Sequence, residues 1–309
     1  TSINCLANNF GDDDLATLLT AIEGTSVRSL CGLTEGQTVA DFSKQNLKPI
    51  DCKIIAAEFG FQGFIAAVTS INCLANKFGE EDLATLLTAI EGTSVRSLCG
   101  LTEGQTVADF SGQNLGPIDM KIMAAEYGFQ GFIAVLTSIN CLNNPLEDGV
   151  QVIINAFEET PRLRTLCGLE EGVEHIDWSD SGKGPADVAL LATDLKAGRA
   201  ADAVANLNIS EAIIGDAGTT LVQAISSSPT LEFITIGKGV RLPLKDDFDS
   251  DILDASAKGI EPGGAIVIAW WLTTSVVSAL TSVNCLHNPL EEGLQVIIKA
   301  FEEDRKSTR

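Results

Sequence analysis

The stretch INCLANKF, residues 71–78, decides the fold because it returns along the chain with small changes. Alternate side chains of an extended strand point to opposite faces. We therefore expect Ile71, Cys73 and Phe78 to face a core. Asn76 then lies at the turn after the strand, where its amide can bond backbone groups. Related stretches lie at residues 3–10, 139–146, 207–214 and 283–290, and Ala212 takes the place of the asparagine in one of them.

This stretch belongs to a tandem repeat. Residues 1–68 and 69–136 differ at ten positions, so 58 of 68 are identical, and most of the changes keep charge or apolar character. Repeats of this length stack so that each buries its apolar face against its neighbours. We predict a single solenoid domain over residues 1–309, with approximate units at 1–68, 69–136, 137–204 and 205–280 and a partial unit at 281–309.

Each unit holds a second strand-like stretch, which in the second unit reads ADFSGQNL at residues 108–115. Residues 29–37, between the two stretches of the first unit, predict either a small inserted loop or an extra strand pair. Helix signals follow the strands, because proline is favoured at the first helical position and carboxylates are favoured in the first turn. The prolines expected at helix starts are Pro49, Pro117, Pro185 and Pro262.

These motifs resemble the leucine-rich repeats of the ribonuclease-inhibitor class, whose pattern L-x-L-x-x-N-x-L recurs over essentially the whole chain. That class includes ribonuclease inhibitor, the Ran GTPase-activating protein and the recognition domains of NOD-like receptors. The runs LCGL at 98–101 and DFSGQNL at 109–115 are similar to repeats in leucine-rich-repeat proteins of microalgae. The resemblance implies an α/β horseshoe, with a parallel sheet on the concave face and helices on the convex face. It also implies a protein-interaction role, or an accessory role in an organelle assembly.

The chain is strongly acidic, with a net charge of −22. This charge opposes nucleic-acid binding, which needs clustered Lys and Arg. It suits either a basic protein partner or a simple solubilising coat. No P-loop, G-x-S-x-G or H-E-x-x-H motif is present, and His175 and His287 lack ligands at metal-binding spacing. We therefore expect no catalytic, cofactor or metal site.

The chain has eight cysteines, and most of them recur at the same position in successive repeats. One such column consists of Cys5, Cys73 and Cys141. Members of a column lie two strands apart, roughly 9–10 Å, which is beyond the roughly 7 Å that a disulfide can bridge. We predict buried, reduced thiols that fill packing sites. Reduced thiols favour a reducing intracellular compartment, either the cytoplasm or an organelle. Because Thr1 lies inside a repeat, we expect the natural start to lie upstream or to have been removed by processing.

A partner is expected on the concave face, where two rows of side chains should point outward. An acidic and amide row beside exposed leucines would suit a basic, partly apolar partner. The alternative is that the polar row only satisfies neighbouring groups and that inserted loops cover the leucines. The polar row comprises Asn4, Asp41, Asn72, Asp109, Asn140, Asp177, Asn208, Asp254 and Asn284, and the apolar row comprises Leu6, Leu74, Leu142 and Leu286.

A second candidate contact is Trp271, which takes the helix position held by Glu58, Glu126 and Asp194 in the other units. If that position faces outward, Trp271 is an exposed contact anchor. The alternative is a shifted helix that buries both Trp270 and Trp271. The repeat register makes the apolar run over residues 265–280 a repeat helix leading into the next strand and not a membrane span, although docking on a membrane protein remains an option.

Three functions remain open at this stage. The first is a non-catalytic interaction or scaffolding module, and the second is a permanently bound subunit of a larger assembly. The third is a GTPase-activating protein, which needs an arginine positioned on a bound GTPase. Arg28 and Arg96 are identical between repeats, which favours a structural position over a unique catalytic one.

Overall fold

The structure is a computed structural model that describes residues 1–60, 63–127 and 131–307. Within these residues the structure has nine α-helices and ten short strands, so the fold is mixed α/β. The chain divides into two compact units. The first comprises residues 1–108, 113–137 and 144–162, and the second comprises residues 109–112, 138–143 and 163–309.

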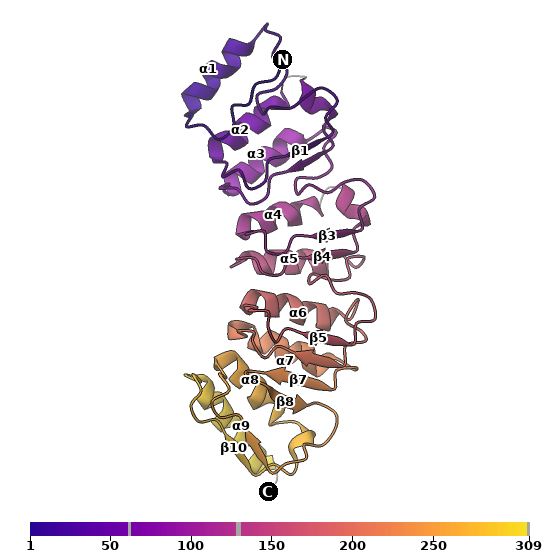
Figure 1. Ribbon diagram of the computed structural model, residues 1–309, viewed down its shortest axis with the longest axis vertical. Coiled ribbons are helices and arrows are strands. Elements are labelled where there is room, and N and C mark those ends of the chain that lie inside the picture. Colours follow the sequence, from indigo (N-terminus) through magenta and orange to yellow (C-terminus); the bar gives the residue numbers. More distant parts are fainter. Residues whose placement is uncertain (61–62, 128–130, 308–309) are drawn as a thin grey trace. The chain divides into compact units, whose positions relative to one another are not determined.

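In the first unit every strand-like stretch is followed by a helix (Figure 1). Strands β1 (Val39–Asp41) and β2 (Ser70–Asn72) pair in parallel, with Ala40 opposite Ile71. Strand β3 (Val107–Asp109) lies where the two units divide the chain. The elements of this unit are α1 (Asp12–Ile22), β1 (Val39–Asp41), α2 (Pro49–Glu58), η1 (Phe64–Ala67), β2 (Ser70–Asn72), α3 (Glu80–Ile90), α4 (Pro117–Glu126), η2 (Phe132–Val135) and α5 (Gly149–Glu158).

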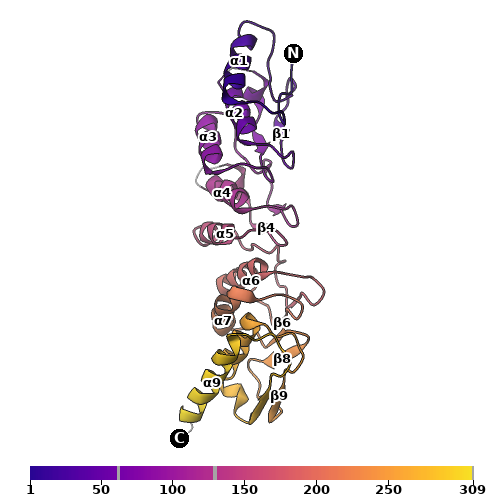
Figure 2. The ribbon, with the colours of Figure 1, turned by 90° about the vertical axis from the view of Figure 1, so that its left-hand side faces the viewer.

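In the second unit helices α6 (Pro185–Ala197) and α7 (Gly218–Ser227) lie on one side and strands β6 (Asn206–Asn208) and β8 (Val240–Pro243) on the other (Figure 2). Strand β6 pairs in parallel with β5 (His175–Asp177) and with β7 (Phe233–Ile236), and β8 closes an antiparallel hairpin with β7. Strands β9 (Ile252–Asp254) and β10 (Ser282–Asn284) form a separate parallel pair. The elements are β4 (Ser138–Asn140), β5 (His175–Asp177), α6 (Pro185–Ala197), β6 (Asn206–Asn208), η3 (Gly215–Ala217), α7 (Gly218–Ser227), β7 (Phe233–Ile236), β8 (Val240–Pro243), β9 (Ile252–Asp254), α8 (Pro262–Trp271), η4 (Ser275–Val277), β10 (Ser282–Asn284) and α9 (Gly293–Ser307).

The predicted helix starts are confirmed, because the four prolines open α2, α4, α6 and α8. An aspartate two residues after the first three prolines caps each helix. In α4, Oδ2 of Asp119 accepts from the Gly116 N–H at 2.8 Å, and Oδ1 accepts from the Ala75 N–H at 2.7 Å. Asp51 and Asp187 make the equivalent pairs of bonds. Each aspartate therefore holds the turn after the first strand-like stretch of its repeat against the start of its own helix.

The predicted inward positions are also confirmed, since Ile71, Cys73 and Phe78 are buried. The Asn76 amide bonds backbone groups as expected. It accepts from the Leu47 N–H at 3.0 Å and donates to the Phe42 carbonyl at 2.9 Å. Asn288 makes the equivalent bonds to Ile260 and Ala255.

The cysteines occupy equivalent sites, as the repeat predicts. The N–H groups of Cys5, Cys73 and Cys141 donate to the carbonyls of Leu30, Leu98 and Leu166, at 2.7, 2.9 and 2.9 Å. Seven of the eight cysteines are buried, and Cys285 is half-buried. Burial raises the pKa of Cys52 and of Cys141 to about 12, so these thiols are protonated at neutral pH. The cysteines therefore act as small packing residues.

A buried carboxylate near the end of α2, α4 and α6 holds the loop that the sequence placed between the two strands. Glu126 accepts from the N–H groups of Leu98 and Cys99, and from the Ser97 hydroxyl at 3.0 Å. Glu58 bonds residues 29–31 and Asp194 bonds residues 165–167 in the same way. Desolvation by burial raises the pKa of all three carboxyl groups, and that of Asp194 reaches about 6.

The sequence predicts either a small loop or an extra strand pair in the segment between the two strand-like stretches of a repeat, and both forms occur. Residues 29–31, 97–99 and 165–167 make only isolated bridges to the neighbouring strand, so they are small loops. In the fourth repeat the segment is the β7–β8 hairpin, in which Phe233 lies opposite Pro243. The hairpin contains the start of the insertion around residues 237–251.

The apolar run over residues 265–280 lies mainly in α8 and η4, two separate short helices. Within the part of the chain that the structure describes, no helix has both the length and the apolar character that a membrane crossing requires.

The raised pKa of Asp194 predicts a pH dependence of stability. An unfolded aspartate has a pKa near 4, so between about pH 4 and 6 the folded state binds the proton more tightly. Stability from this group therefore rises as the pH falls through that window. The variant Asp194→Asn has no carboxyl group to titrate at this position. When the pH is lowered from 7 to 4, the free energy of unfolding of the unaltered chain should increase by on the order of 1–3 kcal/mol relative to that of the variant. Urea unfolding at both pH values measures this, and a constant or falling difference contradicts it.

Candidate protein-contact surface

The second strand-like stretch of each repeat forms β1, β3, β5 or β9, which we call the second-type strands. Each has one buried residue between two exposed residues, and the exposed residues form the outward face of the sheets. In the first unit, β1 exposes Val39 and Asp41 around the buried Ala40. In the second unit, β5 exposes His175 and Asp177, and β9 exposes Ile252 and Asp254. Each of these strands thus offers one carboxylate and one apolar or imidazole side chain to solvent.

The side chains of the predicted polar row are all held by the same local hydrogen bond. At every position the side-chain oxygen accepts the N–H of the residue two places later, at 2.9–3.2 Å. This is an Asx turn, which ends the three-residue strand. The residues that form it are Asn4, Asp41, Asn72, Asp109, Asn140, Asp177, Asn208, Asp254 and Asn284.

Two carboxylates of this row also bind the next strand. Asn208 donates to Oδ1 of Asp177 at 3.0 Å, and Asn284 donates to Oδ1 of Asp254 at 3.1 Å. The Ser179 N–H lowers the pKa of Asp177, and the Ser256 hydroxyl lowers the pKa of Asp254. Both carboxylates therefore stay ionised at neutral pH. The alternative, that the polar row serves neighbouring groups, also holds in part, because each of its side chains accepts a hydrogen bond from a nearby backbone N–H.

The prediction of exposed leucines is wrong at three of four positions. Leu6, Leu74 and Leu142 are buried, with 6%, 1% and 7% of their surface exposed, whereas Leu286 is 66% exposed. The prediction extended the alternation of the strand beyond its end. Strand β2 stops at Asn72, so the alternation no longer applies at Leu74, which lies in the core.

The prediction of an outward Trp271 is also wrong. Trp271 is fully buried, its Nε1–H donates to the Pro243 carbonyl at 2.7 Å, and its ring packs edge-on against Phe248 with centroids 5.1 Å apart. The helix is not shifted, because Glu58 and its equivalents are buried at this position too. Trp270 is half-buried. The β7–β8 hairpin pairs its own backbone groups, so this repeat can replace the carboxylate with an indole.

Sequence reasoning missed two features. The first is the set of exposed residues that precede the buried strand position: Val39, Val107, His175 and Ile252. Alternation predicts them as readily as it predicts the aspartates. The second is the buried carboxylate, whose signal is an acidic residue kept at one helix position in three repeats.

The remaining candidates have structural surroundings. Arg28 and Arg96 both bind carbonyl groups of the loop just before them. His175 and His287 are exposed. No group of three His, Cys, Asp or Glu side chains that could hold a metal ion occurs among the described residues. The chain matches no protein-family model, and no curated protein sequence matches it.

The burial of Leu74 can be tested against an exposed equivalent. Leu74→Ala removes a core side chain and should lower the free energy of unfolding by about 2–5 kcal/mol. Leu286→Ala changes the same residue type at the same repeat position and should cost less than about 0.5 kcal/mol. Urea unfolding of the two variants compares them. Equal costs would show that the two leucines share one environment, contrary to the structure.

Proposed function

We propose that the chain is a non-catalytic protein-interaction or scaffolding module. Its repeats stack as a leucine-rich-repeat solenoid of the ribonuclease-inhibitor type, and a protein partner binds the outward face of the strands. The observation that carries this proposal is the exposed pair on each second-type strand, for example Val39 with Asp41 and Ile252 with Asp254.

The composition of this face favours a basic partner with some apolar surface. Val39, Val107 and Ile252 are 42%, 61% and 49% exposed, so apolar side chains lie beside the acidic positions. Such a mixture is typical of protein contact surfaces, where an apolar centre is surrounded by polar groups. The acidic positions attract a positively charged partner and orient it.

The Asx turns add a second argument. Because the side-chain oxygens of Asp41, Asp177 and Asp254 are already bonded to backbone, these carboxylates lose little freedom when a partner binds. Of the contact residues expected from the sequence, the proposal therefore keeps the polar row and Leu286. The three buried leucines and Trp271 are left out, and Val39, Val107, His175 and Ile252 are added.

The test is recovery of partner proteins from a lysate of the source cells with Asp177→Asn/Asp254→Asn. Asparagine already forms the Asx turn at Asn72 and Asn208, so this variant removes charge and keeps the turn. We expect recovery of a basic partner to fall at least about tenfold. Binding by the unaltered chain should also weaken as salt is raised.

The matched control is Asp13→Asn/Glu81→Gln, which removes two exposed charges from helices α1 and α3. Recovery should be unchanged in this variant. If both double variants lose the partner equally, net charge and not the strand face drives binding. If neither loses it, the contact surface lies elsewhere.

A further inference from the structure

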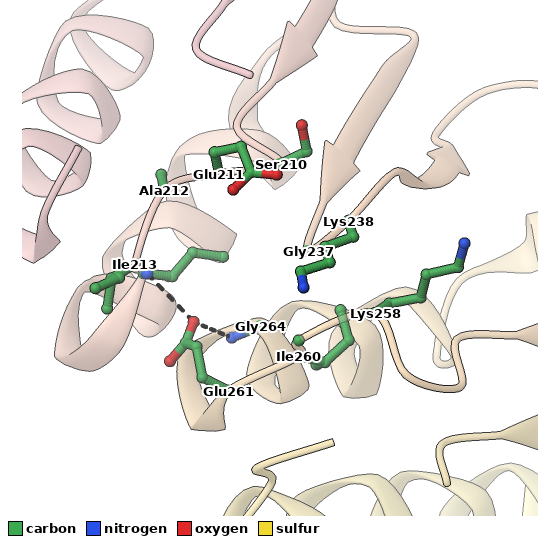
Figure 3. A pocket seen from close by; sticks show the side chains of 12 residues that line it. Ser210, Glu211, Ala212, Ile213, Gly237, Lys238, Lys258, Ile260, Glu261 and Gly264 are labelled. Carbon is green, nitrogen blue, oxygen red and sulfur yellow. Dashed lines mark hydrogen bonds between the residues drawn. The ribbon is translucent and has the colours of Figure 1, made fainter. Parts of the chain in front are cut away.

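The second unit contains a cavity of about 130 Å³ between the turn after β6, the β7–β8 turn and the start of α8 (Figure 3). That volume can hold a small polar group with water. Figure 3 shows Lys238 extending over the mouth of the cavity and Lys258 pointing away from it. The wall near α8 is formed by Ile260, Glu261 and Gly264.

The other repeats show what normally fills this place. Helix α8 starts at Pro262 as α4 starts at Pro117, so Gly264 stands where α4 has Asp119. The Asp119 carboxylate accepts from the Gly116 N–H before the helix and from the Ala75 N–H in the turn after β2. Asp51 and Asp187 do the same in their repeats. The fourth repeat lacks this carboxylate.

The donors that correspond to Gly116 and Ala75 are the N–H groups of Glu261 and Glu211. Among the described residues neither N–H has a hydrogen-bond acceptor. Both residues line the cavity. The fourth repeat therefore has two backbone donors at the positions whose equivalents bind a carboxylate in three other places. The turn at Glu211 differs from those repeats: it lacks the positive φ of Ala7, Ala75 and Asn143 and is closed by a bond from the Ala212 N–H to the Ile209 carbonyl.

The Glu261 carboxylate lies beside this cavity, with Oε1 3.7 Å from where a Cβ on Gly264 would stand, and it bonds other N–H groups than these two. Its oxygens accept from the N–H groups of Gly263 at 2.9 Å and Gly264 at 3.0 Å, and from those of Ile214 and Gly215 at 3.2 Å. The helix end is thus capped by Glu261 itself. The Lys238 ammonium makes no ion pair among the described residues, so it can offset the negative charge beside an incoming anion.

We propose that this cavity binds a carboxylate group from a ligand, either a small carboxylic acid or an acidic group of a peptide. The bound carboxylate takes the place of the missing aspartate side chain. It accepts the N–H groups of Glu211 and Glu261 and pairs with the ammonium of Lys238. This site is independent of the outward strand face.

The test is a titration of the ¹⁵N-labelled chain with sodium acetate, followed by backbone amide NMR shifts. The amides of Glu211 and Glu261 should shift in a saturable way, with a Kd on the order of 1 mM for so small a ligand. Acetamide, which has the same shape and no charge, should leave these amides unmoved, as should sodium chloride at equal ionic strength.

Two variants and a control identify the site. Lys238→Ala should weaken acetate binding about tenfold. Gly264→Asp supplies a tethered carboxylate and should abolish the response; its added Cβ lies 3.2 Å from Ile260 Cγ2, so that side chain must move slightly. The matched control is Lys245→Ala, whose ammonium bonds the Thr230 carbonyl away from the cavity and which should bind acetate normally.

Some outcomes would overturn the proposal. One is the absence of a saturable shift, and another is equal shifts with acetate and acetamide. Unchanged acetate affinity in Lys238→Ala would show that the ammonium is not part of the site. Because Lys238 is exposed, this variant should fold normally and keeps the test valid if Gly264→Asp misfolds. Saturable binding of inorganic phosphate without any response to acetate would contradict the assignment to carboxylates.

Discussion

Carboxylates on the helices bind the backbone N–H groups of the neighbouring strands and loops, and the rest of the structure depends on them. The strands are only three or four residues long, so strand pairing leaves many donors without a partner. A buried backbone donor needs an acceptor. Asp119 supplies one at the start of α4 and Glu126 supplies one at its end. One helix thereby fixes the turn after β2 and the loop at residues 97–101.

This constraint explains the outward face and its exceptions. In β1, β3, β5 and β9 the residues on either side of the buried position face solvent, while Leu74 lies in the core beyond the end of β2. Where the β7–β8 hairpin pairs its own donors, the carboxylate is replaced by Trp271. Where Glu261 caps α8, Gly264 replaces the aspartate and leaves a cavity. Each departure from the repeat thus follows a local change in how donors are satisfied.

The sequence predicts the mixed α/β class, the helix starts at the four prolines, the Asn76 bonds and the buried cysteines. These features depend on spacing and local chemistry, which the repeat preserves. It leaves the burial of Leu74 and of Trp271 only as alternatives, and the reasons it gives for them, inserted loops and a shifted helix, are not the ones that the structure shows. Alternation holds only while a strand continues, and three-residue strands end sooner than the pattern does. An acidic helix residue is normally exposed, so the buried position of Glu126 and its equivalents follows only from the loop that binds them.

Amide hydrogen exchange measures the central claim directly. The Leu98 and Leu166 N–H groups bond Glu126 and Asp194, so they should exchange as slowly as the Ile71 N–H, which bonds the Ser97 carbonyl. The Glu211 N–H has no acceptor among the described residues and should exchange fast in the free protein. If Leu98 and Leu166 exchange as fast as Glu211, the carboxylates do not hold these loops and the account fails.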